Sequence, residues 1–105
     1  MYEGHVRPAQ IDSYVAQLSV PGALTAALNW YRAMRSDLAA LPAVTVPTTF
    51  VWSDQDPAIG RVAAERCGEF VDADFRFVEL TGISHWIPEQ DSEVLAEAIL
   101  ARIGD

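Results

Sequence analysis

Strand-like and helix-like segments alternate through the second half of the chain. This alternation limits the possible folds more than any other feature of the sequence. Residues 48–52 are β-branched or aromatic without a break, which is typical of a strand buried on both faces. Apolar residues then recur at helical spacing over residues 59–70, and residues 75–80 alternate like a strand with one partly solvated face. A loop to residue 90 and a last helix over residues 91–103, with Asp91 as a good N-cap, complete the pattern. The order predicts a β-α-β-α unit with two parallel strands.

Two short amphipathic helices are expected before this unit. Apolar residues recur at helical spacing over residues 10–19 and again over residues 21–35. Pro21 suits the first turn of the second helix, because the N–H that it lacks would have no partner within the helix there. We therefore divide the chain into residues 1–40, which carry these helices, and residues 41–105, which carry the β-α-β-α unit.

Each loop that follows an expected strand carries a residue suited to acid–base chemistry. Asp56 follows the first strand in WSDQDPAIG, and His85 follows the second in ELTGISHWIPE. Loops after parallel strands lie at the same end of a sheet, where open α/β sheets bind ligands. A carboxylate that accepts a hydrogen bond from one imidazole nitrogen leaves the other nitrogen to take a proton from a hydroxyl or from water. Taken singly, Asp56 fits a cap and His85 a packed residue, but as a pair they favour hydrolytic chemistry.

The composition of the chain disfavours several classes of binding partner and cofactor. The 105 residues carry a net charge of −8 at pH 7, spread along the chain, which disfavours nucleic acid and anionic membrane surfaces. No apolar run is long enough to span a bilayer. The N-terminus does not resemble a signal peptide and Cys67 is the single cysteine, so we expect a cytoplasmic protein. Histidine and cysteine show no zinc spacing and no glycine-rich phosphate loop occurs, so we expect neither a metal nor another cofactor.

Residues 46–103 resemble the C-terminal half of α/β-hydrolases of the epoxide hydrolase and haloalkane dehalogenase group. VPTTFVWSDQDPAIG is similar to their acid-bearing strand and loop, and LTGISHWIPEQDSEVLAEAI is similar to their histidine loop and final helix. Family members usually have Gly where this chain has Ser53, and often Gly where it has Ser84. The resemblance implies an α/β fold that is the C-terminal β-α-β-α portion of an α/β-hydrolase parallel sheet, preceded by cap-domain helices.

The same resemblance implies a set of site residues. Asp56, rather than Asp54, would be the catalytic acid, His85 the base, and Trp86 a wall packed beside the histidine. PGALTAALNWYRAM is similar to the last cap-domain helix of epoxide-hydrolase-like members. The tyrosine of NWYR, which is Tyr31 here, would project into the pocket and donate a hydrogen bond to the epoxide oxygen. Tyr31 also lies on the apolar stripe of its helix, so packing explains it about as well.

The chain departs from the family in its missing nucleophile. It has no GxSxG or GxDxG elbow and no HGxP-like oxyanion loop, and a two-stranded parallel sheet would leave a long strand edge unpaired. We therefore expect a fragment that is inactive alone and receives its nucleophile from a missing N-terminal part or a second chain. The expected reaction is hydrolysis of a small-molecule substrate without a cofactor, of the epoxide hydrolase type. A serine esterase-type α/β-hydrolase and a non-catalytic truncated or accessory chain are the alternatives.

Overall fold

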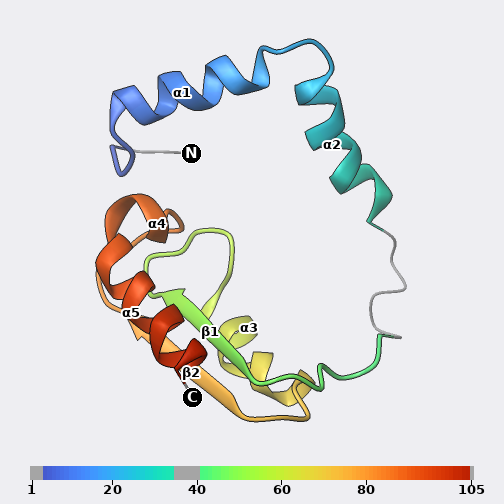
Figure 1. The fold of residues 1–105 in the computed structure, drawn as a ribbon, viewed down its shortest axis with the longest axis vertical. Helices are drawn as coiled ribbons and strands as arrows, with labels where there is room; N and C mark the ends of the chain where they lie inside the picture. Colours follow the sequence, from blue (N-terminus) through green and yellow to red (C-terminus); the bar gives the residue numbers. More distant parts are fainter. Residues whose placement is uncertain (1–3, 35–40, 105) are drawn as a thin grey trace. The chain divides into compact units, whose positions relative to one another are not determined.

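The computed structural model describes residues 4–34 and 41–104. The chain divides into two compact units: a helical unit, Val6–Leu41, and a sheet unit, Met1–His5 with Pro42–Asp105. The helical unit holds helices α1 (Pro8–Leu18) and α2 (Ala23–Ala33) (Figure 1). The two units meet in the chain between Leu41 and Pro42. The expected division into residues 1–40 and 41–105, and the role of the first part in a cap, stay predictions.

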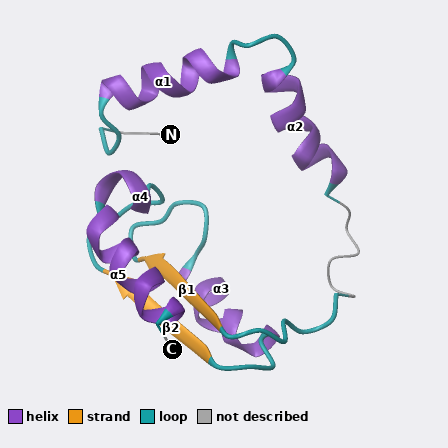
Figure 2. Cartoon of the chain, viewed as in Figure 1, coloured by secondary structure: helices purple, strands orange, loops and turns teal. Residues whose placement is uncertain are grey.

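The sheet unit alternates strand and helix in the predicted order (Figure 2). Its elements in chain order are β1 (Thr48–Ser53), α3 (Arg61–Arg66), the 3-10 helix η2 (Cys67–Phe70), β2 (Phe75–Leu80), α4 (Ile87–Gln90) and α5 (Ser92–Ile103). β1 and β2 pair in parallel, with Thr48 opposite Phe75 and Ser53 opposite Leu80. A mixed helix and strand fold with a small parallel sheet is therefore confirmed, and its place as the end of a larger sheet stays a prediction.

Helices contact both faces of this sheet. On one face, Thr49 Oγ1 accepts a hydrogen bond of 2.8 Å from Arg102 of α5. Trp52 lies three positions further along β1 and therefore points to the opposite face, since side chains alternate along a strand. There the guanidinium of Arg61, from α3, lies 4.9 Å from the centre of the Trp52 ring. Trp52, Ala64 and Leu80 are the buried apolar side chains of this unit among the described residues.

β1 is less buried than its unbroken apolar run predicts. Only Trp52 and Ser53 are buried, and the first four residues of the strand are half-buried. In the described part of the chain β1 pairs with β2 alone, so its second edge has no partner strand there. A strand in the middle of a covered parallel sheet would be buried along its whole length.

Several helix boundaries also differ from the expected ones. α2 begins after Pro21 and Gly22, because Gly22 has a φ of 85°, a left-handed conformation that cannot continue into an α-helix. The helix expected over residues 59–70 starts at Arg61 and tightens into η2, and the loop expected to residue 90 ends in the short helix α4. Asp91 occupies the N-cap position of α5, but its side chain makes no capping hydrogen bond.

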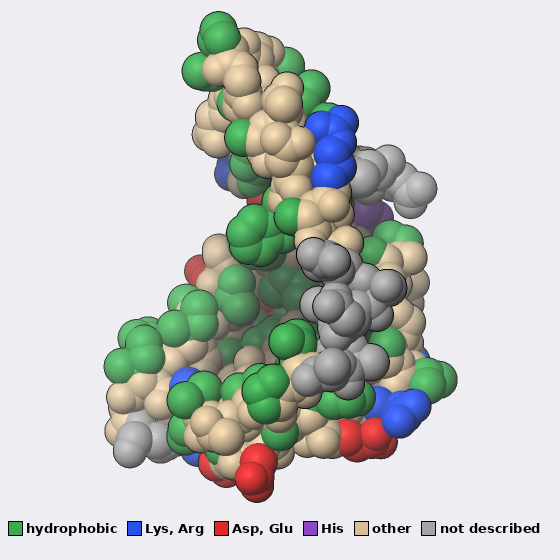
Figure 3. All heavy atoms as spheres, turned by 90° about the vertical axis from the view of Figure 1, so that its right-hand side faces the viewer, with side chains coloured by type: hydrophobic (Ala, Val, Ile, Leu, Met, Phe, Trp, Pro, Cys, Tyr) green, Lys and Arg blue, Asp and Glu red, His purple; other side chains and the backbone are tan. Residues whose placement is uncertain are grey.

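Large apolar side chains are exposed on both units, and hydrophobic atoms are prominent on the face drawn in Figure 3. α1 and α2, which the structure describes over their whole length, bury none of their residues. Leu24, Leu28 and Tyr31 on α2 are 52%, 43% and 69% exposed. Within residues 4–34 and 41–104, no helix has both the length and the apolar character needed to cross a bilayer.

Candidate active site

The acid loop (residues 54–56) and the base loop (residues 81–85) bring Asp56 and His85 together. Both loops follow the carboxyl ends of parallel strands, which lie at the same edge of the sheet. Oδ2 of Asp56 lies 2.9 Å from Nδ1 of His85. An ionised carboxylate can only accept hydrogen bonds, so Nδ1 carries the hydrogen in this pair. The second ring nitrogen, Nε2, is then in the form that can take up a proton.

The Asp56 carboxylate is fixed by the backbone as well as by the histidine. Its Oδ1 accepts hydrogen bonds from the N–H groups of Ala58 at 2.7 Å and Ile59 at 3.0 Å. The Asp56 side chain is 6% exposed and that of His85 is 47% exposed. Burial alone would raise the pKa of the Asp56 carboxyl, but the hydrogen bonds from His85, Ile59 and Ala58 together lower the pKa below its ordinary value of 3.8. The pair thus joins an ionised carboxylate, whose side chain is nearly covered, to an accessible imidazole.

Asp54 lies two residues away but has a different partner. Its Oδ1 accepts a hydrogen bond of 2.7 Å from the N–H of Gly82, which has a φ of 75°. Asp54 therefore holds the turn that starts the base loop. The structure pairs His85 with Asp56 and not with Asp54, in agreement with the assignment that the resemblance implies, while the catalytic roles themselves stay predictions.

Trp86 and Tyr31 were predicted to contact substrate. Trp86 lies edge-on to His85, with ring centroids 5.7 Å apart and ring planes at 85°, a favourable aromatic geometry. Tyr31 lies on α2, in the helical unit. Asp56 and His85 belong to the sheet unit, and a position of Tyr31 at this pair stays a prediction.

Three curated relatives match most of this chain. "Epoxide hydrolase 3" of Mus musculus is 27% identical over 93% of this chain and 27% of its own length. "Epoxide hydrolase A" of Mycobacterium tuberculosis (strain ATCC 25618 / H37Rv) is 27% identical over 87% of this chain and 30% of its own length. "AB hydrolase superfamily protein YfhM" of Bacillus subtilis (strain 168) is 36% identical over 86% of this chain and 32% of its own length. The chain is related to epoxide hydrolase-like α/β-hydrolases.

The chain spans about a third or less of the length of these relatives. No family model and no solved structure matches it. The similarity to these relatives thus agrees with an α/β fold. The candidate site residues are supported by the geometry alone.

Sequence reasoning missed a polar network beside the Asp56–His85 pair. Ser53 and Ser84 are buried, and Ser53 Oγ donates a hydrogen bond of 2.6 Å to the backbone oxygen of Ser84. Gln90 Oε1 accepts hydrogen bonds from the N–H of Ser84 at 2.9 Å and from its hydroxyl. The available signal was serine at two positions, Ser53 at the end of β1, where the family usually has glycine, and Ser84 in the base loop, where it often does.

The geometry also restricts what the described residues can do chemically. Asp56 and His85 can hold and move one proton, but Ser53 and Ser84 are buried and donate their hydroxyl hydrogens to neighbouring oxygens. Neither serine is placed as a nucleophile in front of the imidazole. Among the residues that the structure describes, no three His, Cys, Asp or Glu side chains group as metal ligands.

Proposed function

We propose that this chain supplies the acid and the base of an epoxide hydrolase-like α/β-hydrolase. The supporting observation is the 2.9 Å contact between Asp56 and His85 at the carboxyl ends of two parallel strands. Asp56 orients the imidazole and stabilises its charged form, and His85 takes a proton from water or from a nucleophile. Trp86 forms a wall of the pocket, and Tyr31 donates a hydrogen bond to the substrate oxygen. The proposal includes a small-molecule substrate, no cofactor and a cytoplasmic location.

The nucleophile decides between two forms of this reaction. If it is an aspartate, its carboxylate opens the epoxide to form an ester, and the substrate oxygen gains a proton from Tyr31. His85 then takes a proton from the water that hydrolyses the ester, and the leaving alkoxide takes the hydrogen of the carboxylic acid that forms. His85 finally returns its proton to the Tyr31 phenolate. If the nucleophile is a serine, His85 takes its proton as the hydroxyl attacks an ester substrate. The 105 residues contain no elbow of either type. We propose that polypeptide outside these residues supplies it.

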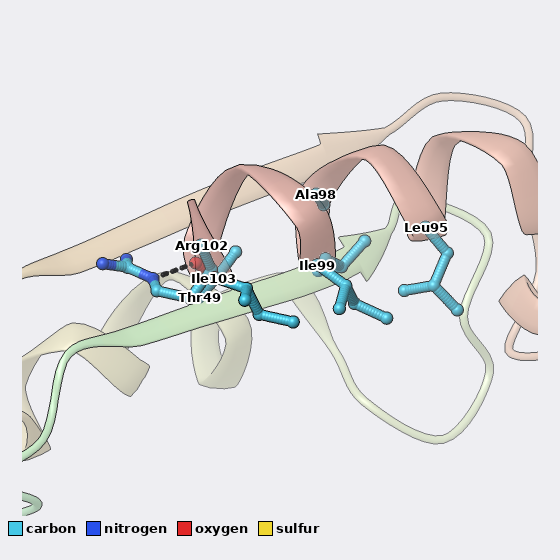
Figure 4. A pocket seen from close by; sticks show the side chains of 7 residues that line it. Thr49, Leu95, Ala98, Ile99, Arg102 and Ile103 are labelled. Atoms are coloured by element: carbon cyan, nitrogen blue, oxygen red, sulfur yellow. Dashed lines mark hydrogen bonds between the residues drawn. The ribbon is translucent and has the colours of Figure 1, made fainter. Parts of the chain in front are cut away.

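A groove beside β1 supports the docking of that polypeptide. The groove has a volume of about 350 Å³ and lies between α5 and β1 (Figure 4). Its lining includes the side chains of Thr49, Val51, Leu95, Ile99 and Ile103. Ile99 and Ile103 are 49% and 74% exposed, so apolar surface is available there. The proposed occupant is the nucleophile-bearing part of the hydrolase, since two thirds or more of each relative's length lies outside the matched region.

The function is tested by restoring the nucleophile. The DNA upstream of the Met1 codon and the neighbouring genes are read for an elbow motif, and the polypeptide found is expressed with this chain. The assembled protein is expected to convert styrene oxide to its diol, measured by chromatography, while the chain alone is expected to be inactive. Turnover of p-nitrophenyl acetate but not of the epoxide would favour the serine esterase alternative. A stable assembly that hydrolyses neither compound would contradict the proposed enzyme and support the accessory role.

The docking groove is tested by placing a charge in it. Ile99→Asp is expected to prevent co-purification with the nucleophile-bearing polypeptide, because a carboxylate would have to be buried among the apolar side chains of the groove. Val62→Asp, at an exposed apolar side chain of α3, is the matched control and is expected to assemble normally. Circular dichroism checks that both variants fold. A wild-type chain that forms dimers through this groove, and loses them in Ile99→Asp, would show that a second copy is the occupant and overturn this assignment.

A further inference from the structure

The acid loop and the base loop are joined by more than the Asp56–His85 pair. The N–H of Asp54 donates to the backbone oxygen of Leu80 at 3.0 Å, and the N–H of Gln55 donates to that of Ile83 at 3.2 Å. These bonds connect residues that lie 26 and 28 positions apart. They hold the two loops side by side, but they end at Ile83, two residues before the histidine.

Ser53 and Ser84 extend this connection to the histidine itself. We propose that Ser53, Ser84 and Gln90 are positioning residues that fix the direction of His85, so that the Asp56–His85 pair is preformed in this chain. The hydroxyl of Ser53 donates to the backbone oxygen of Ser84 at 2.6 Å, and Ser53 and Ser84 are only 0% and 4% exposed. The inference rests on the proposed function, because a positioning role presupposes that His85 acts as the base.

The planarity of the peptide group turns this single hydrogen bond into control of the histidine. The backbone oxygen of Ser84 and the N–H of His85 belong to the same peptide group, whose atoms lie close to one plane. Fixing that oxygen therefore fixes the plane from which the His85 side chain departs. Gln90 fixes the other side of Ser84, because its Oε1 accepts from both the N–H and the hydroxyl of Ser84.

Burial makes the network costly to break and hence suited to positioning. Loss of the Ser53 hydroxyl would remove a hydrogen-bond donor to the backbone oxygen of the buried residue Ser84, and such groups are costly to leave unsatisfied. Asp56 is held independently by the N–H groups of Ala58 and Ile59. The two partners of the pair are thus placed by separate contacts, so loosening one side should weaken the contact between them.

Nuclear magnetic resonance on the 105-residue chain tests the inference without any turnover. The carboxyl carbon of Asp56 is titrated in the wild type and in Ser53→Ala. We expect the variant to show a higher pKa for Asp56, because a histidine that is less well placed donates a weaker hydrogen bond to the carboxylate. The exchange-protected Nδ1 proton of His85 is expected in the wild type and should be lost in the variant. Ser13→Ala, at an exposed serine of α1, is the control and should keep both signals.

A second variant keeps the test decisive if Ser53→Ala does not fold. Gln90→Ala removes the acceptor on the other side of Ser84 and is expected to raise the pKa of Asp56 in the same direction. An unchanged Asp56 titration in a folded variant of either kind would overturn the inference. Failure of the proposed function is a separate result: the assembled protein would then lack activity although the pair still forms in the wild type and responds to Ser53→Ala.

Discussion

Replacing His85 by alanine in the assembled, nucleophile-bearing protein is expected to lower kcat by about 10²–10⁴-fold, the range that a positioned general base contributes. In both proposed forms of the reaction, the imidazole of His85 takes the proton. Its side chain is 47% exposed, so its removal should leave the fold intact. Steady-state rates of epoxide and ester hydrolysis measure the loss, and the thermal unfolding midpoint, expected to stay close to that of the wild type, is the control for folding.

The same variant identifies the step that His85 serves. With an aspartate nucleophile, His85→Ala should still open the epoxide and should accumulate the ester, because only the attack of water needs the base. Mass spectrometry would then show the protein with one added substrate mass. With a serine nucleophile no adduct is expected, because the first step already needs the base. His85→Gln, which can still donate to Asp56 but cannot take up a proton, should be equally inactive. Turnover that survives both substitutions would show that His85 is not the base.

The strands and their order were predictable because they depend on local patterns. Residues 75–80 alternate in polarity, and β2 has these same bounds, while β1 is one residue longer than its apolar run. Parallel pairing followed from the single helical connection between the strands. With parallel strands, the meeting of Asp56 and His85 at one sheet edge required no further information from the sequence.

The further contacts around the site were not predictable, because they join residues that are far apart in the sequence and close together only in the fold. The bond from Ser53 to Ser84 joins residues 31 positions apart, and no periodicity reports it. The burial of β1 depends on what covers its second edge and the groove beside α5. No local pattern in the sequence encodes that covering. The role of Tyr31 depends on how the helical unit meets the sheet unit, and that placement follows from no feature of its own helix.

Asp56→Asn is expected to lower kcat of the assembled protein by about 10³–10⁴-fold, in line with the loss of a triad carboxylate elsewhere. The amide can still accept hydrogen bonds from Ala58 and Ile59 through its oxygen. Its nitrogen would then face Nδ1 of His85, which must accept, so the ring hydrogen moves to Nε2. An imidazole in that form cannot take a proton through Nε2. Asp72→Asn, at an exposed carboxylate, is the matched control and should keep the wild-type kcat.

The same substitution is expected to change how stability depends on pH, which tests the pair without any activity. The pKa of Asp56 in the folded chain lies below its ordinary value of 3.8. The ionised carboxylate therefore stabilises the fold fully above that value, and this contribution is lost as the pH falls through the lower, folded pKa. Urea unfolding at a series of acidic pH values should show a free energy of unfolding that falls less steeply in Asp56→Asn than in the wild type. Parallel acid profiles would mean that the carboxylate is not held by His85 and the backbone, and the geometric basis for acid–base chemistry in this chain would be lost.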